Sequence, residues 1–431
     1  MEFRTALPGL AVSVLLLTGC ADPVQKTQAA VSPEKAVLNH YADIGLATYE
    51  DTLYTARSLQ DTIRHLLDNP TEANLQAAKT AWKAARVPYQ QSEVFRFGNS
   101  IVDDWEGRVN AWPLDEGLID YVATNYGNSS DENAFYTLNV IANPVLSVGG
   151  VEVNARQINK QLLAETLHEI DDVEANVATG YHAIEFLLWG QDLNGTEPGA
   201  GRRPATDFNL MQCTGGHCDR RRDYLSAATE LLIDDLQAMV ENWKTDGRAR
   251  ADLAAKGNLG GLSTMLTGMG SLAYGELAGE RIKLGLMLHD PEEEHDCFSD
   301  NTHWSHFYDA KGIQNVYLGE YHRVDGSRLK GPSLSTLVQQ IDPASDRRLR
   351  ARLDATQIAM QQMVNAAQAG SSFDVLIAEN NTAGNQIVQH VVDALSAETQ
   401  AIENVITLLK LDGIELEGSD SLDNPAAVLT N

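Results

Sequence analysis

The strongest constraint on the fold is a helical spacing of apolar residues that returns along most of the chain. Side chains three or four positions apart lie on the same face of a helix, so this spacing is typical of amphipathic helices. The late segment 385–411 carries such a face with Ile387, Val391, Leu395, Ile402, Val405 and Leu409. Further helices are expected at residues 33–67, 72–95, 157–189, 222–243, 262–288 and 345–369. Patterns typical of strands are scarce, which predicts an all-α protein.

The length of the chain predicts two helical bundles packed together and joined by long irregular connections. About 400 of the 431 residues follow the N-terminal segment, which is more than one bundle needs. We place an N-terminal bundle at 33–250 and a C-terminal bundle at 251–431. Between Gly98 and Gly150 the helical spacing is lost. Irregular chain of this length is usually functional or contains short helices.

The first 32 residues have the composition of a lipoprotein signal and its tether. Arg4 precedes an apolar core, Leu7–Leu17, that is too short to span a membrane, and the sequence LTGC ends at Cys20. Residues 1–19 are therefore predicted to be a signal peptide, with Cys20 lipidated and 20–32 as a tether. Ala21 after the cysteine favours the outer membrane of a Gram-negative cell, facing the periplasm. An ordinary secretory signal is the alternative.

The charge of the chain excludes one class of partner. Sixty acidic residues against 32 basic ones give a formal net charge of -28. Such a surface repels nucleic acid and anionic lipid, so contact with a membrane is expected only through the lipid on Cys20. The same charge concentrates cations near the protein, or it simply keeps the protein soluble.

Three cysteines remain besides Cys20. Cys213 and Cys218 enclose a short loop and could form a disulfide in an oxidising compartment, which would leave Cys297 unpaired. A zinc site formed by Cys213, Cys218 and His217 is the alternative, although it lacks a second pair of ligands.

The candidate site is centred on the stretch GYHAIEFLLWGQD, Gly180–Asp192. His182 and Glu185 are three residues apart on an otherwise apolar helix, so their side chains can reach one point in space. Neutral imidazole and carboxylate suit Zn, Fe(II) or Mn. Alternatively, the pair forms a hydrogen bond in the bundle core. Gly180 would permit close approach of a helix or a ligand.

Other polar residues in apolar settings are candidates for the rest of this site. As metal ligands we add Glu93 and Asp115, and as ligand-binding neighbours Arg96, Trp112 and Arg281. An acidic, histidine-rich segment could complete a metal site with His182, or it could be a solvated loop. Its candidate side chains are Glu292, Glu293, Glu294, His295, Asp296, His303 and His306.

With these stretches in view, the chain resembles the imelysin family. The family's Gly-x-His-x-x-Glu signature stands here as Gly180, His182 and Glu185, and SEVFRFG, NAWPLD, GELAGERI and EHDCFSDNTHWSH resemble its iron-regulated branch. The resemblance implies two packed helical bundles, a lipoprotein or periplasmic location linked to iron acquisition, and a site around the His-x-x-Glu pair. Only the motif residues carry over from the family.

Three functions are compatible with the sequence. The first is binding of iron, another divalent metal or an iron-bearing ligand, with iron-transport proteins as partners. The second is a zinc metallopeptidase, which the family's peptidase label implies, but no third ligand, base or His-Glu-x-x-His motif is visible. The third is a structural lipoprotein. Iron or zinc is the expected cofactor, and no motif for haem, nucleotide or flavin is present.

Overall fold

A computed structural model describes residues 1–2, 31–127, 133–148 and 150–429 of the chain. The chain divides into two units, Met1–Ser32 and Pro33–Asn431. Cys20 and the rest of the predicted signal lie outside the described residues. Among the helices of the described part, none is long and apolar enough to cross a membrane. About 65% of the chain is helical, which confirms the all-α prediction.

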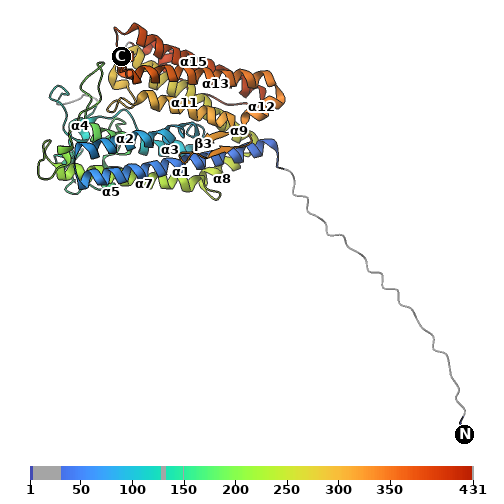
Figure 1. Ribbon diagram of the computed structural model, residues 1–431, viewed down its shortest axis with the longest axis horizontal. Coiled ribbons are helices and arrows are strands. Elements are labelled where there is room, and N and C mark those ends of the chain that lie inside the picture. Colours follow the sequence, from blue (N-terminus) through green and yellow to red (C-terminus); the bar gives the residue numbers. More distant parts are fainter. Residues whose placement is uncertain (3–30, 128–132, 149, 430–431) are drawn as a thin grey trace. The chain divides into compact units, whose positions relative to one another are not determined.

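One group of helices in the larger unit is formed by the first half of the chain (Figure 1). Helix α1 (Pro33–Asp68) packs along α2 (Glu72–Gln90) and α7 (Cys218–Trp243). Helices α3 (Ser100–Asn110) and α6 (Gly180–Trp189) pack against α7 as well. The apolar stripe of α1 predicted from sequence is the face that it buries, including Leu59, Ile63 and Leu66.

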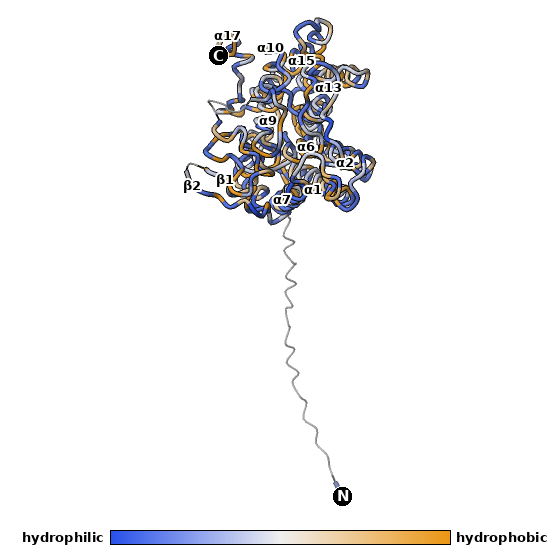
Figure 2. The backbone as a smooth tube through the Cα atoms, turned by 90° about the vertical axis from the view of Figure 1, so that its left-hand side faces the viewer, coloured by the Kyte–Doolittle hydropathy of each residue, from blue (hydrophilic) through white to orange (hydrophobic). Residues whose placement is uncertain are grey.

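A second group consists of α11 (Thr302–Leu318), α13 (Pro343–Gln368) and α15 (Thr382–Leu408). Helices α13 and α15 lie beside one another and apart from α1 and α7 in both views, and α11 lies along α13 (Figures 1 and 2). A continuous helical run, α9 (Gly257–Ser271), η5 (Leu272–Lys283) and α10 (Leu284–Leu288), contacts both α1 and α15. The predicted division near residue 250 stays a prediction, because residues 33–431 form one unit.

Small residues on α9 allow close packing against neighbouring elements. A Cβ atom at Gly268 would lie 2.3 Å from the backbone oxygen of Val94, and one at Gly261 would lie 2.6 Å from Leu38. A side chain at either position would force these elements apart. The run α9–η5–α10 can therefore lie between the two groups of helices.

Two predicted helices differ from those observed. The helix expected at 72–95 ends at Gln90 and is followed by a 3-10 turn, η1 (Glu93–Phe95), where the Ser92 hydroxyl bonds to Tyr89 O. The helix expected at 157–189 is broken by left-handed backbone at Glu169, Asp171 and Asp172. Only its last third, α6, is regular.

The remaining elements are short. Two antiparallel hairpins pair β1 with β2 and β3 with β4. These strands are β1 (Val145–Val148), β2 (Val151–Asn154), β3 (Glu320–His322) and β4 (Arg328–Lys330). The short helices are α4 (Glu116–Ile119), α5 (Lys160–Leu162), η2 (Leu163–Leu167), η3 (Ile170–Asp172), η4 (Ala205–Phe208), α8 (Arg248–Ala255), η6 (Pro291–Glu293), α12 (Leu334–Ile341), α14 (Phe373–Ile377), α16 (Asp420–Asp423) and α17 (Pro425–Val428).

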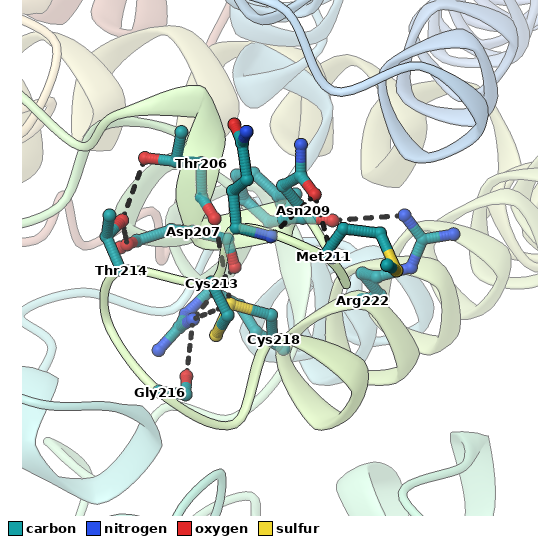
Figure 3. Close-up of a disulfide and its surroundings, with 12 residues drawn as sticks. Thr206, Asp207, Asn209, Met211, Cys213, Thr214, Gly216, Cys218 and Arg222 are labelled. Atoms are coloured by element: carbon teal, nitrogen blue, oxygen red, sulfur yellow. Dashed lines mark hydrogen bonds between the residues drawn. A yellow bond between two sulfur atoms is a disulfide. The ribbon is translucent and has the colours of Figure 1, made fainter.

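Cys213 and Cys218 form a disulfide at the start of α7 (Figure 3). Within the loop that it closes, the Thr214 hydroxyl donates to Asp207 at 2.7 Å and contacts the Thr206 hydroxyl at 2.8 Å. The disulfide prediction is confirmed and the zinc alternative with His217 is wrong, because disulfide sulfurs are not thiolate ligands. Cys297 is the free cysteine of the described chain.

We predict that the buried acid Glu398 on α15 lowers stability at neutral pH. Its side chain is 1% exposed, and its oxygens have no hydrogen-bond partner of ordinary geometry in the described chain. Burial raises its pKa to about 7, although the nearby Thr356 hydroxyl lowers the pKa in part. In the unfolded chain the pKa of this carboxyl is near 4.5. Below pH 4.5 the carboxyl is protonated in both states and does not reduce the free energy of unfolding. As the pH rises to about 7, the free energy of unfolding falls by about 3 kcal/mol.

Glu398→Gln should consequently raise the thermal unfolding midpoint at about pH 8 and change it little at about pH 4.5. Glu403→Gln is the matched control, since Glu403 is exposed on the same helix. Equal effects of the two substitutions at pH 8 would contradict the prediction.

Candidate functional site

Helix α6 carries the site and is buried on every side. All of its residues from Gly180 to Trp189 are buried. Gly180 has a φ of +78°, and a Cβ there would lie 2.5 Å from the Val109 backbone oxygen at the end of α3. The predicted close approach is thus made by α3. The structure gives Gly180 a packing role, and its role in ligand binding stays a prediction.

His182 and Glu185 are bonded to each other, with 3.0 Å between His182 Nδ1 and Glu185 Oε2. The other carboxylate oxygen, Oε1, accepts the Ser299 backbone N–H at 3.0 Å. His182 Nε2 is buried and has no hydrogen-bond partner in the described chain. Because both oxygens of Glu185 are engaged, this residue suits the task of orienting the His182 ring better than that of the metal ligand we expected.

The acidic, histidine-rich segment brings two further ligands to His182. Potential ligand atoms of His182, His295 and Asp296 all lie within 4.8 Å of one another, and the three side chains are at most 1% exposed. The rings of His182 and His295 are 4.8 Å apart. This part of the segment is buried, so the solvated-loop alternative is wrong for it.

Two more histidines stand on α11, which begins at Thr302 inside the segment that we expected to be a loop. The His306 ring lies 6.2 Å from that of His295, and neither of its nitrogens has a hydrogen-bond partner in the described chain. His303 Nδ1 is also buried without a partner there. The described chain therefore leaves several imidazole nitrogens of the cluster without a hydrogen-bond partner.

A buried ion pair holds Asp296 in place. Arg86 on α2 donates to Asp296 Oδ1 at 2.9 Å and to Asn110 at 2.6 Å. Asp296 Oδ2 accepts from the side chains of Asn301 and Ser305. Arg86 is not among the candidate residues that we named from the sequence. Its place on the apolar side of α2 is the signal that could have assigned it to the buried site.

The charges of the cluster set its protonation at neutral pH. Burial, reinforced by Arg86, lowers the pKa of His182 to about 3, and burial with Arg281 lowers that of His306 to about 3. Burial would raise the pKa of Asp296, but Arg86 and His295 hold it well below its usual range. The cluster therefore presents neutral imidazoles and a carboxylate, which is a donor set for Fe(II) or Zn.

Glu93 and Arg281, predicted as neighbours of the site, are bonded to each other in a network that includes Glu276, which Arg281 contacts at 2.7 Å. Arg281 donates to Glu93 at 2.8 Å and to Asp309 at 3.2 Å, and all three are buried. Arg96 contacts Glu276 at 3.4 Å in the same network. Glu93 is not grouped with the ligand atoms of the His182 cluster, and the charge of Arg281 lowers the pKa of the histidines in that cluster.

Trp112 and Asp115 line a cavity of about 510 Å³ next to the cluster. Its wall also includes Glu116, Tyr126, Glu292 and Cys297. The Trp112 ring lies 5.5 Å from the His295 ring, and its Nε1 donates to Glu294 O. Trp112 therefore stands between the cavity and the histidines. Asp115, bonded to Asn133, lines the cavity and is not among the grouped metal ligands.

Comparison with known proteins gives one consistent result. A family model described as Imelysin matches residues 45–402. Iron-regulated protein A of Synechococcus elongatus is 24% identical over 349 residues, which covers 78% of this chain and 76% of that protein.

Two solved structures share the fold. A crystal structure described as an iron-regulated protein A precursor from Parabacteroides distasonis has a TM-score of 0.63 and 18% identity, and covers 89% of this chain and 97% of its own. An imelysin-like protein from Psychrobacter arcticum has a TM-score of 0.59 and 17% identity, covering 88% and 96%.

Removing the charge of Asp296 should destabilise the protein strongly. In Asp296→Asn the Arg86 guanidinium stays buried without its counter-charge, which costs about 3 kcal/mol. Asp103→Asn is the control, because Asp103 pairs with Arg96 at a half-exposed position and should cost less than about 1 kcal/mol. The urea midpoints of both variants measure this. Equal midpoints would contradict the prediction, since they would mean that the buried ion pair stabilises the protein no more than the half-exposed one.

Proposed function

Because the chain belongs to the imelysin family, we propose that it is an envelope protein of iron acquisition that binds iron, or another divalent metal, at His182, His295 and Asp296. Glu185 holds His182 in the orientation that binding requires. The cargo is a metal ion or a small iron-bearing ligand, and an iron-transport protein is its recipient.

The unpartnered Nε2 of His182 is the observation that carries this proposal. A buried nitrogen without a partner is costly, and this one lies in a group of ligand atoms within 4.8 Å of one another. Two imidazoles and one carboxylate are the donors of many non-haem Fe(II) sites. His306, with both nitrogens unpartnered, offers a further imidazole beside His295.

The surroundings of the three residues fit the task. The bond from Glu185 Oε2 to His182 Nδ1 leaves Nε2 as the ligand atom, as second-shell carboxylates do in metal proteins. Arg86 balances the charge of Asp296 while no cation is bound. Burial and the charge of Asp296 raise the pKa of Glu185 well above its usual range, and a bound metal would add a positive charge that favours its ionised form.

Iron is the preferred cargo because of the relatives. The proteins from Synechococcus elongatus and Parabacteroides distasonis are both named for iron regulation, and both match most of this chain. The donor set also suits zinc, so the metal must be measured.

Hydrolysis of peptides is the competing function, since the family model also carries a peptidase name. A catalytic zinc site keeps one position open for water and substrate. Here His182, His295, Asp296 and Glu185 are all at most 1% exposed. A peptide bond could reach them only after the protein opens, and this favours binding over proteolysis.

Metal content is the direct test. Protein purified without chelator and titrated with Fe(II), Fe(III) and Zn should contain close to one metal per chain by elemental mass spectrometry. His182→Ala should lose it, because the ligand with the free nitrogen is removed. Glu185→Gln should bind roughly 10-fold to 100-fold more weakly, since only the orientation of His182 is affected.

His390→Ala is the control, because His390 is an exposed histidine on α15. Circular dichroism should show that every variant is folded. A folded wild type that binds none of these metals would overturn the proposal. Peptide cleavage that is abolished by chelator and by Glu185→Gln would instead establish the peptidase.

We also propose that lipid on Cys20 anchors the protein, on the strength of the LTGC motif. Cys20→Ala should move the protein from the membrane fraction to the soluble fraction, because the acylated thiol is lost. Cys297→Ala, which removes the free cysteine of the folded unit, should leave the distribution unchanged. Identical fractionation of the two variants would refute the anchor.

A further inference from the structure

A second group of acidic side chains lies beside the histidine cluster. Carboxylate oxygens of Glu294, Asp300 and Asp374 all lie within 4.8 Å of one another. Glu294 is 1% exposed and Asp374 is fully buried. The function proposed above makes no use of these three residues.

The oxygens of this group lack partners. Both oxygens of Asp374, Oε1 of Glu294 and Oδ1 of Asp300 are buried and make no hydrogen bond of ordinary geometry in the described chain. Three carboxylates at this spacing repel one another when ionised. In the described chain no basic side chain bonds to these unpartnered oxygens, so a cation would satisfy them.

The backbone holds the three side chains in this arrangement. Asp300 has left-handed backbone, with a φ of +49°, in the turn before α11. Asp374 is in the first turn of α14. Glu294 directly precedes His295 and Asp296, whose side chains face the first cluster. The three carboxylates are therefore brought together by turns and helix ends and not by pairing with each other.

A narrow cavity of about 20 Å³ leads to Glu294. Its wall includes Asp192, Glu292 and Glu294 together with Pro291, Cys297 and Phe298, so acidic side chains line part of it. Asp192 also raises the pKa of all three acids. The charge of Lys83 acts on Asp300, but its amine donates to Ser299 O at 2.7 Å. A cavity of this size holds a water molecule or an ion.

We propose that Glu294, Asp300 and Asp374 form a second cation site, for a hard divalent cation of the size of Ca²⁺. The donors are all carboxylate oxygens, which suit Ca²⁺ and not the metals that prefer imidazole. Two oxygens that share one Ca²⁺ at about 2.4 Å are at most about 4.8 Å apart. The observed group is within this limit. The site shares no ligand with the His182 cluster, so it can bind a cation when no metal is held there.

Calcium titration of the full chain tests the site. After removal of divalent ions with EDTA, adding Ca²⁺ should raise the thermal unfolding midpoint of the wild type by at least about 3 °C, since the ion binds only the folded chain. Asp374→Asn should abolish this rise. Without Ca²⁺ the variant should unfold at a higher temperature than the wild type, because one repelling charge is gone.

Two controls separate this site from other effects. Glu293→Gln removes one charge from the same segment outside the group and should keep the full Ca²⁺ response. His182→Ala should also keep it, even though it loses iron or zinc, so failure of one site is distinguishable from failure of the other. No rise with Ca²⁺ in the wild type, or an equal rise in Asp374→Asn, would overturn the proposal.

Discussion

The buried ion pair between Arg86 and Asp296 is the interaction on which the candidate site depends. Arg86 comes from α2, in the first group of helices, and Asp296 comes from the segment that leads into α11, in the second. Their bond places His295 next to His182, although the two histidines are more than a hundred residues apart in sequence. The site exists because the two groups of helices meet at this pair.

Stability alone does not account for this arrangement of buried charges. Buried ion pairs often contribute less than well-packed apolar residues would, because both charges must leave water. Here the cost is larger, since the same region also buries Arg281 with Glu93 and Asp309, and histidine nitrogens without partners. Such a concentration of unsatisfied polar groups is typical of a binding site and not of a bundle core.

The sequence predicted the fold class and the centre of the site, for physical reasons. Helical spacing predicts α1, α7, α13 and α15 well, because each buries one continuous apolar face. The pair His182 and Glu185 was predicted because three-residue spacing on a helix is a local property. The left-handed backbone that ends the helix before α6 begins at Glu169, a residue type that seldom adopts it, so the break has no clear local signature.

The partners of His182 could not be assigned from sequence for a different reason. Contact between α6 and the segment 294–306 depends on how the two groups of helices pack, and spacing within one helix contains no information on that. The segment was predicted as a possible part of the site, but which of its residues face which group of ligands was not predicted. Glu294 faces the acidic group while His295 and Asp296 face the histidines.

The acidic group and the histidine cluster would influence each other through the backbone that they share. Consecutive residues of one backbone serve both, so a cation held by Glu294 restrains the chain at His295 and Asp296 as well. Restraint of a ligand before binding reduces the entropy that binding must remove. A cation at the acidic group would therefore increase affinity at the histidines, and by linkage a metal at the histidines would increase affinity at the acidic group by the same factor.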